Sequence, residues 1–165
     1  MKPQAQPALQ LEQFIPYRLS VLSNAVSSSI ADAYRRRHSL SIPEWRIMAV
    51  LARYPGISAR EVGDKTRMDA VAVSRAVNRL LRARRLKRGT ADHDRRKSIL
   101  TLSDQGFAVY REIVPFALQY ESALLAVLQP FERRIFDDIL KKLTDHAQLL
   151  EARAQQLEAA AKRRK

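Results

Sequence analysis

The sequence of 165 residues contains no cysteine. Disulfide frameworks, thiolate metal sites and oxidant sensing by a thiol are therefore excluded. The chain has only four glycines, and none belongs to a P-loop, a G-x-G-x-x-G or a G-x-S-x-G pattern. Motifs that cradle a nucleotide or present a serine nucleophile are thus absent.

The three histidines are far apart in the sequence, at His38, His93 and His146. None has the H-E-x-x-H spacing or a comparable spacing of metal ligands. We therefore expect no catalytic residues, no metal site and no cofactor, and we do not expect an enzyme.

No apolar run approaches the ~20 residues needed to span a bilayer. The first residues also lack the order of a signal peptide, which is charged, then apolar, then small. The expected location is the cytoplasm, without a membrane contact.

Acidic residues are few: 17 Asp and Glu stand against 30 Lys and Arg, giving a net charge of +13 and a pI near 10.7. The excess is local. Residues 58–97 carry 13 basic and 5 acidic side chains, residues 162–165 carry four basic ones, and residues 98–161 carry 6 basic and 9 acidic ones. A charge run is often only a solvated surface, but here it coincides with a helix-turn-helix pattern and favours nucleic acid over membrane.

That pattern begins at Ser58, which forms an S-x-x-E capping box with Glu61. A tight turn is expected at residues 65–68, and Asp69 can cap a second helix. Two short helices joined by such a turn are typical of helix-turn-helix, in which the second helix is exposed for recognition.

The second helix has two faces. Val73, Val77, Leu80 and Leu81 recur at the spacing of one buried helical face. The opposite face carries small residues and donors suited to phosphates and base edges. The candidate DNA contacts in the two helices and the turn between them are Arg60, Thr66, Arg67, Ser74, Arg75, Asn78, Arg79 and Arg82.

Residues 86–90 and 98–102 alternate as short strands and enclose a polar run, which predicts a β-hairpin wing. Asp92, His93 and Asp94 could be taken for a metal trio. Adjacent residues in a basic hairpin point in different directions, so we expect a wing tip instead.

Helices are also expected outside this region. A long one runs from Pro16 to about Arg37. A second follows a capping box of Ser41 and Glu44 and runs to about Tyr54. Ser103 caps a third, in which the interior Pro115 predicts a kink or break, and Pro130 opens the last. The last two have more apolar surface than a small lobe can cover, which predicts a homodimer.

The first long helix contains many hydroxyls, including Ser23, Ser27 and Ser28 beside Asn24. They indicate either a polar-lined cavity or serines that bond to the preceding turn or face water. Trp45 is either a core anchor or a ligand platform, and Arg46 is either a solvated charge or a carboxylate clamp.

Three stretches together resemble the MarR family of bacterial transcriptional regulators. They are Ser74-Arg75 in the second helix, Asp94-Arg95-Arg96 in the wing, and Leu100-Thr101-Leu102-Ser103-Asp104-Gln105-Gly106. The resemblance extends from about Phe14 to the last helix. Arg85 departs from it, because the family usually has a glycine there that ends the helix in a left-handed conformation. Arg85 must bear strain, or the helix must end differently.

The resemblance implies that Arg96 enters the minor groove, that Asp94 orients its guanidinium, and that Arg95 adds charge nearby. Residues 14–24 resemble the opening helix of a branch that controls catabolism of aromatic acids, some members responding to CoA thioesters. A buried anion needs donors beside an apolar wall. The candidate effector-binding residues are Arg18, Asn24, Ser28, Trp45 and Arg46.

The expected fold is mainly α with a small β-hairpin wing, a winged helix-turn-helix lobe plus a helical dimerisation region. Its expected parts are residues 1–40, an arm and long dimerisation helix; 41–102, the DNA-binding lobe; and 103–165, dimerisation helices and a basic tail. The expected function is a dimeric repressor of a pseudo-palindromic operator in double-stranded DNA, released by a small aromatic acid or its CoA thioester. A sequence-tolerant architectural DNA-binding protein and a small basic enzyme are the alternatives.

Overall fold

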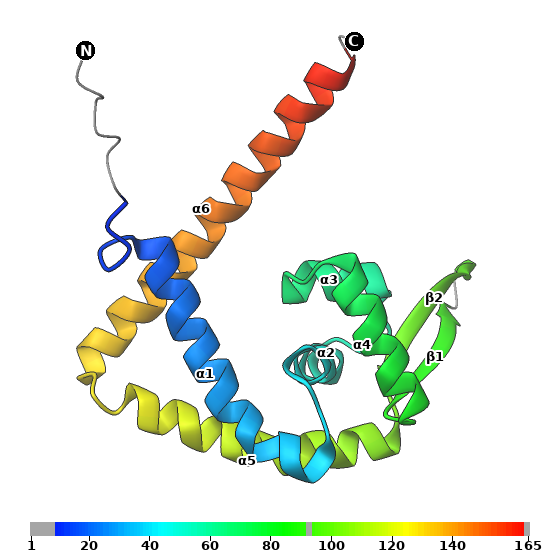
Figure 1. Ribbon diagram of the computed structural model, residues 1–165. Helices are drawn as coiled ribbons and strands as arrows, with labels where there is room; N and C mark the ends of the chain where they lie inside the picture. Colours follow the sequence, from blue (N-terminus) through cyan, green and yellow to red (C-terminus); the bar gives the residue numbers. More distant parts are fainter. Residues whose placement is uncertain (1–8, 92–93, 164–165) are drawn as a thin grey trace, which may run out of the picture. The chain divides into compact units, whose positions relative to one another are not determined.

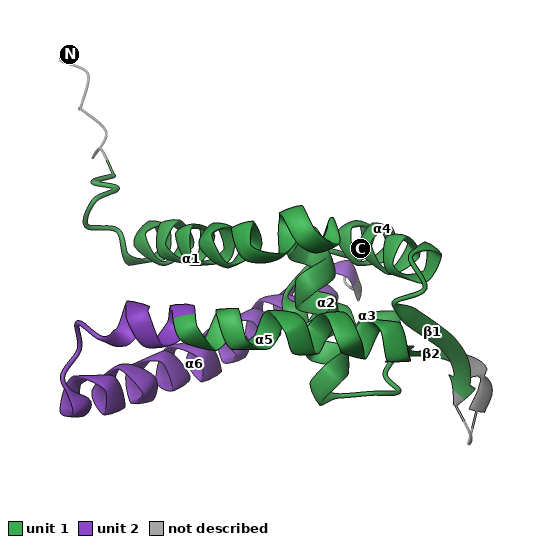
Figure 2. Ribbon diagram, turned by 90° about the horizontal axis from the view of Figure 1, so that it is seen from below, with its two compact units in different colours: residues 1–119 green, residues 120–165 purple. Residues whose placement is uncertain are grey.

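A computed structural model describes residues 9–91 and 94–163 of the chain (Figure 1). Within these residues six α-helices and a two-stranded sheet follow in the order α1, α2, α3, α4, β1, β2, α5, α6. Two compact units, Met1–Gln119 and Tyr120–Lys165, are coloured separately in Figure 2. The expected fold class, mainly α with a β-hairpin wing, is confirmed. The division at residues 40 and 102 concerns function and stays a prediction.

Helix α1 spans Ile15–His38, close to the predicted bounds. Pro16 lies in its first turn, and the C-cap residue after His38 is Ser39, whose φ of 49° is left-handed. Tyr34 is buried near the C-terminal end, whereas large apolar side chains of the first half are exposed. The exposed ones are Ile15, Leu19, Val21 and Leu22. Only the C-terminal part of α1 therefore contributes to the core of its unit.

Helix α2 spans Ile42–Arg53 and begins with the predicted capping box. The Ser41 backbone N–H donates to Glu44 Oε2 at 2.7 Å, and the Glu44 N–H donates back to Ser41 Oγ at 3.4 Å. Pro43 occupies the first turn, where the missing N–H costs nothing. The helix buries Ile47, Met48 and Leu51.

Helix α3, Ala59–Thr66, and helix α4, Ala70–Arg82, form the predicted helix-turn-helix. Ser58 and Glu61 make the predicted capping box at the start of α3. Asp69 Oδ1 accepts from the Ala72 N–H at 2.8 Å and caps α4. The turn between them is short because Arg67 is left-handed, with φ of 54°.

Strands β1, Leu86–Ala91, and β2, Asp94–Leu102, pair antiparallel and form the predicted wing. Leu86 faces Leu102 in the register, and both are buried. Leu100 also bonds the segment before α3: its N–H donates to Ile57 O at 2.8 Å. The wing base is therefore held to the helix-turn-helix by backbone bonds.

Of the two alternatives predicted for the junction between α4 and β1, the structure has the second, in which the helix ends differently. Arg84, not Arg85, is left-handed, with φ of 55°. The Arg84 N–H donates to Leu81 O at 3.0 Å and the Arg85 N–H to Leu80 O at 2.9 Å. These bonds satisfy carbonyls at the end of the helix in the Schellman arrangement. The helix thus ends one residue earlier than a glycine at position 85 would end it.

Helix α5 spans Asp104–Leu125 and begins as predicted at Ser103, whose Oγ accepts from the Gly106 N–H at 2.9 Å. A Cβ on Gly106 would lie 2.1 Å from Arg85 O, so only glycine fits this close approach. Of the predicted kink or break near Pro115, the break is wrong, because α5 continues through this residue, and the kink stays a prediction. A proline interrupts one hydrogen bond, and the bonds of the neighbouring turns suffice to carry the helix past it.

One hydrophobic core occupies the unit that contains the wing. It draws on the end of α1, on α2, α3, α4 and α5, and on both strands. Its fully buried large side chains are Tyr34, Leu40, Ile47, Met48, Leu51, Val62, Val77, Leu80, Leu100 and Ile113. The buried face of α4 therefore packs in this core, and its opposite face is exposed.

The second unit contains the end of α5 and helix α6, Pro130–Arg163. Pro130 opens α6 as predicted, and Glu132 Oε2 accepts from the Gln129 N–H at 2.7 Å. The apolar side chains of α6 are exposed along much of its length. They are Phe131, Ile135, Ile139, Leu140, Leu143, Leu149, Leu150 and Leu157. The last two residues of the basic tail, Arg164 and Lys165, lie outside the described residues.

Candidate functional site

Helix α4 presents a polar face on a buried base. Val73, Ala76, Val77 and Leu80 are at most 4% exposed, and Leu81 is half-buried. The residues on the opposite face of α4 are exposed. They are Ala70, Val71, Ser74, Arg75, Asn78, Arg79 and Arg82. A helix so anchored directs side chains with hydrogen-bond donors outward, as entry into a major groove requires.

The predicted contacts next to this face differ in what their side chains already do. Arg60 and Arg67 are exposed. Thr66 is half-buried, and its Oγ1 donates to Val62 O at 2.8 Å, so its hydroxyl proton is engaged within α3. Because this proton is engaged, the Thr66 hydroxyl can only accept a further hydrogen bond, which suits the amino group of a base rather than a phosphate oxygen. Arg82 is exposed, with Nε 3.4 Å from Asn78 O.

The predicted wing contacts belong to β2 by their backbone. The side chains of Asp94, Arg95 and Arg96 lie outside the described residues, as do Asp92 and His93 altogether. The roles of these residues stay predictions. In the described ranges, no group of three or more metal-ligating side chains is found, and no helix has the length and apolar character to cross a bilayer.

Tyr54, at the end of α2, lies against two basic side chains. These contacts were not predicted from the sequence. Lys65 Nζ lies 3.9 Å from the centroid of the Tyr54 ring, and the Arg53 guanidinium carbon lies 5.1 Å from it. Tyr54 is 42% exposed. Such cation–π contacts restrain a long basic side chain and leave its charge accessible. Lys65 and Arg53 are additional candidates for phosphate contacts, signalled in sequence only by the Arg-Tyr pair before Pro55.

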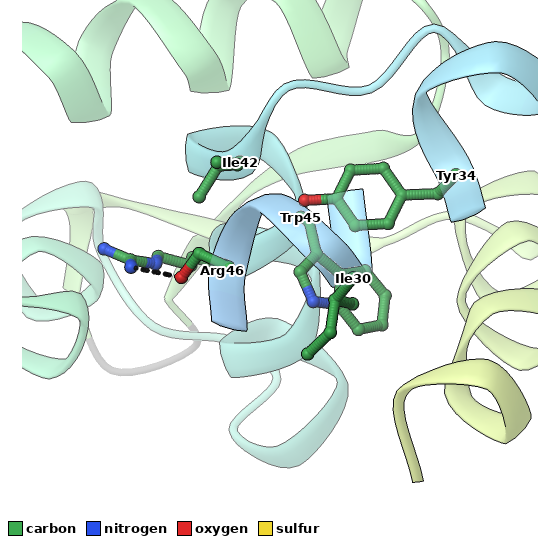
Figure 3. Close-up of a pocket in the computed structure, with 6 residues that line it drawn as sticks. Ile30, Tyr34, Ile42, Trp45 and Arg46 are labelled. Carbon is green, nitrogen blue, oxygen red and sulfur yellow. Dashed lines mark hydrogen bonds between the residues drawn. The ribbon is translucent and has the colours of Figure 1, made fainter. Parts of the chain in front are cut away.

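A cavity of about 100 Å³ lies between α1 and α2 (Figure 3). Its lining residues are Ser27, Ile30 and Tyr34 of α1 and Ile42, Trp45 and Arg46 of α2. The Trp45 ring lies 5.7 Å, centroid to centroid, from Tyr34 and also 5.7 Å from Tyr110 of α5. The wall is thus aromatic and apolar, with polar atoms at a few points.

Tyr34 supplies the most unusual of these polar atoms. Its side chain is 1% exposed, and its hydroxyl is the one buried side-chain N or O without a hydrogen-bond partner in the described part of the chain. In Figure 3 the hydroxyl points toward the α2 side of the cavity, where Ile42 lies. Burial raises the pKa of Tyr34 to about 12, although the charges of Arg35 and Arg46 act in the opposite direction. The group is therefore a neutral hydroxyl at ordinary pH, able to bond a polar ligand atom.

Arg46 gives the cavity its positive charge. Its Nη2 donates to Ser27 Oγ at 3.0 Å, the bond drawn in Figure 3, and the side chain is half-buried. This bond orients the guanidinium and occupies one of its five N–H groups. An arginine held in this way can bond a carboxylate with two parallel N–H groups.

The cavity contains two of the five predicted effector-binding residues, Trp45 and Arg46. Arg18, Asn24 and Ser28 are exposed on α1 and do not line it. Ser27 was predicted only as one of several hydroxyls that could line a cavity, and Ser28 rather than Ser27 was predicted to bind the effector. One residue rotates a helical side chain by about 100°, so Ser28 points elsewhere, whereas residues 27, 30 and 34 share a face.

The sequence is similar to that of known transcriptional regulators. Residues 38–97 match the family model of the MarR family. The HTH-type transcriptional regulator BilQ of Clostridium symbiosum is 25% identical over 108 residues, which are 66% of this chain and 75% of BilQ.

Solved structures of other proteins share the fold. A MarR/EmrR family transcriptional regulator from Acinetobacter sp. ADP1 superposes with a TM-score of 0.78 at 24% identity, over 86% of this chain and 99% of its own. Bordetella bronchiseptica BpsR, whose DNA binding is regulated by 6-hydroxynicotinic acid, has a TM-score of 0.72 at 24% identity, over 85% and 99%. The architecture is therefore the MarR-like winged helix fold.

Proposed function

We propose that this protein is a MarR-family transcriptional regulator that binds a pseudo-palindromic operator as a homodimer and is released by a small aromatic acid. The family assignment is supported by the match over residues 38–97 and by the solved structures of the same fold. The observation that carries the function is the exposed, donor-bearing face of α4, anchored on a buried apolar base. Such a regulator would act in the cytoplasm.

Dimerisation is supported by large apolar side chains that are exposed in the single chain. They lie on the first half of α1 and along α6, for example Leu22 at 46% and Leu150 at 53% exposure. Exposed large apolar side chains in such number are typical of an interface. Two copies related by a two-fold axis would present two recognition helices to successive major grooves, about 34–36 Å apart.

The cavity supports the choice of effector. An aromatic ring would lie against Trp45, its carboxylate would bond Arg46, and the Tyr34 hydroxyl would bond a ring substituent. A volume of about 100 Å³ is smaller than the ~150 Å³ of a cavity known to take benzene, so a single ring fits only with some expansion. The body of a CoA thioester would have to remain outside. The volume therefore favours a free monocyclic acid over its thioester.

Release of DNA requires a difference in affinity. The acid must bind the conformation with misplaced recognition helices better than the DNA-bound conformation, because equal affinity for both shifts nothing. Helices α1 and α2 form opposite walls of the cavity, so expansion by a bound acid changes their spacing. The acid therefore binds better to the conformation that has the expanded cavity.

A mobility-shift assay on the promoter region adjoining the protein's own gene tests this function. It is repeated with benzoate, hydroxybenzoates, 6-hydroxynicotinate and their CoA thioesters. Trp45 is the single tryptophan, so its fluorescence reports occupancy of the cavity separately from release of DNA. A complex at nanomolar protein, dissolved by one acid that also changes the fluorescence, is the expected result. Fluorescence quenching without any specific DNA complex would contradict it.

The alternative of an architectural DNA-binding protein is favoured by the net charge of +13. Footprinting separates the two functions, because a regulator protects one pseudo-palindromic site whereas an architectural protein coats the DNA. Continuous protection along the fragment would favour the architectural protein.

A further inference from the structure

We propose that Arg85 is a positioning residue that ties the end of α1 to the junction between helix α4 and the wing. Its Nη2 donates to the backbone carbonyl of His38 at 2.6 Å, across 47 residues of sequence. His38 is the last residue of α1, so this carbonyl is one that the helix leaves without an intrahelical donor. A charged donor to such a group makes one of the stronger kinds of hydrogen bond.

The backbone of the same junction is fixed on both sides. Arg85 O accepts from the Ser103 N–H at 3.0 Å, and Ser103 Oγ donates to Arg84 O at 2.6 Å. The backbone of Gly106 also lies close to Arg85 O, because a Cβ on this glycine would be 2.1 Å from that oxygen. Arg85 therefore moves together with the end of α4 and the start of α5, and its side chain extends this group of contacts to α1.

The end of α1 is also placed against α5. His38 Nε2 lies 3.3 Å from Glu112 Oε2, with the His38 side chain 13% exposed. One turn earlier, Tyr34 of α1 lines the cavity. A displacement of α1 would thus pass through the His38 carbonyl to Arg85, and from there to the recognition helix and wing. This last step rests on the proposed function of the cavity, whereas the positioning role of Arg85 does not.

A direct phosphate contact is the main alternative role for an arginine beside a DNA-binding helix. Arg85 is half-buried and its guanidinium is engaged with α1, whereas Arg84 beside it is exposed. The geometry therefore assigns Arg85 to the contact with the His38 carbonyl rather than to a contact with DNA. Salt dependence distinguishes the two roles, because removal of one phosphate-binding side chain lowers the magnitude of the salt slope by about 0.9.

The test compares Arg85→Ala and Arg85→Lys with Arg111→Ala, which removes the same charge from an exposed position on α5. Amide hydrogen exchange is measured on the full chain well below the unfolding temperature of every variant. In Arg85→Ala, peptides covering residues 38–41 and 84–88 should exchange about tenfold faster, corresponding to one charged hydrogen bond. Arg85→Lys should restore part of the protection, and Arg111→Ala should match the parent. Unchanged exchange at both ends of the link, or equal acceleration throughout the chain, would overturn the proposal.

The same variants are then titrated with operator DNA at several salt concentrations. Arg85→Ala should bind about five- to tenfold more weakly with an unchanged salt slope, because the substitution alters the position of the recognition helix and removes no phosphate contact. A slope reduced by about one unit would make Arg85 a phosphate contact and overturn the assignment. If the parent binds no specific DNA, the proposed function fails, while the exchange experiment still decides the role of Arg85.

Discussion

The outer face of α4 and the cavity between α1 and α2 differ in how their residues come together. Every member of the α4 face belongs to one helix of 13 residues. The cavity combines three residues of α1 with three of α2, so its composition depends on how two helices pack. A face on a single helix follows from periodicity, whereas a cavity between helices depends on rotation about each axis. Sequence reasoning accordingly described the first correctly and selected part of the second.

The two regions are also opposite in solvation. The arginines of α4 are exposed and hydrated, and their contacts with DNA would be screened by salt. Tyr34 is buried and Arg46 is half-buried, so a single hydrogen bond there is worth more than on the surface and an unpartnered group costs more. Mutations should therefore affect the two regions through different measurements.

The largest expected effect is at the junction on which both regions depend. Gly106→Ala places a Cβ 2.1 Å from Arg85 O, and backbone must move to accept it. The free energy of unfolding should fall by about 3 kcal/mol, at the upper end of overpacking costs, as measured by chemical denaturation. Gly89→Ala is the matched control, because its nearest contact is an ordinary 3.7 Å to Ile99. Similar losses in both variants would mean that the close approach is not the cause.

On the α4 face, Arg75→Ala should weaken operator binding by ~1–3 kcal/mol if the guanidinium reads a guanine edge. Binding to random DNA should change little, and specificity should relax at one base position. The measurement is a set of titrations on operator, single-base variants and random DNA at constant salt. Equal losses on all DNAs would show a phosphate contact instead.

In the cavity, Arg46→Ala should raise the acid concentration needed for release about tenfold, or ~1.4 kcal/mol, while operator affinity stays within a few-fold. Arg18→Ala is the informative partner, because Arg18 is exposed on α1 and does not line the cavity. Release by the acid should be unchanged in this variant. An equal loss for Arg18→Ala would mean that the site extends along α1 beyond the cavity.

The smallest effect is expected for Tyr34→Phe, which removes a buried hydroxyl without a partner. The protein without ligand should become more stable by about 1 kcal/mol, whereas binding of the acid weakens. Because burial raises the pKa of Tyr34 from 10.0 to about 12, folding opposes its ionisation. Burial of the neutral phenol rather than the phenolate therefore contributes fully to the free energy of unfolding of the parent below pH 10. This contribution is lost as the pH rises toward 12.

Thermal unfolding of both proteins from about pH 8 to 11 measures this difference. The stability advantage of Tyr34→Phe should widen above pH 10, the ordinary pKa of the phenol. A variant less stable than the parent at every pH would mean that the hydroxyl is satisfied in solution.

Sequence alone determined the local features. Capping at Ser41, Ser58, Asp69 and Ser103 follows from bonds within three residues, so these helix starts were predicted correctly. The two faces of α4 follow from the period of 3.6 residues in the same way. The wing followed from alternation between turn residues.

Tertiary structure decided the features that depend on distant parts of the chain. The left-handed conformation is at Arg84, and Ser103, 19 residues further along the chain from Arg84, bonds the carbonyls of residues 84 and 85. The unpartnered hydroxyl of Tyr34 and the bond from Arg46 to Ser27 exist only because α1 packs on α2. Periodicity predicts which face of a helix is buried, but it does not predict which residues that face packs against. The rotation and distance of a partner helix depend on side chains far away in sequence. For this protein the sequence therefore determined which face of α4 is exposed, and only the packing of α1 on α2 determined which side chains surround the cavity.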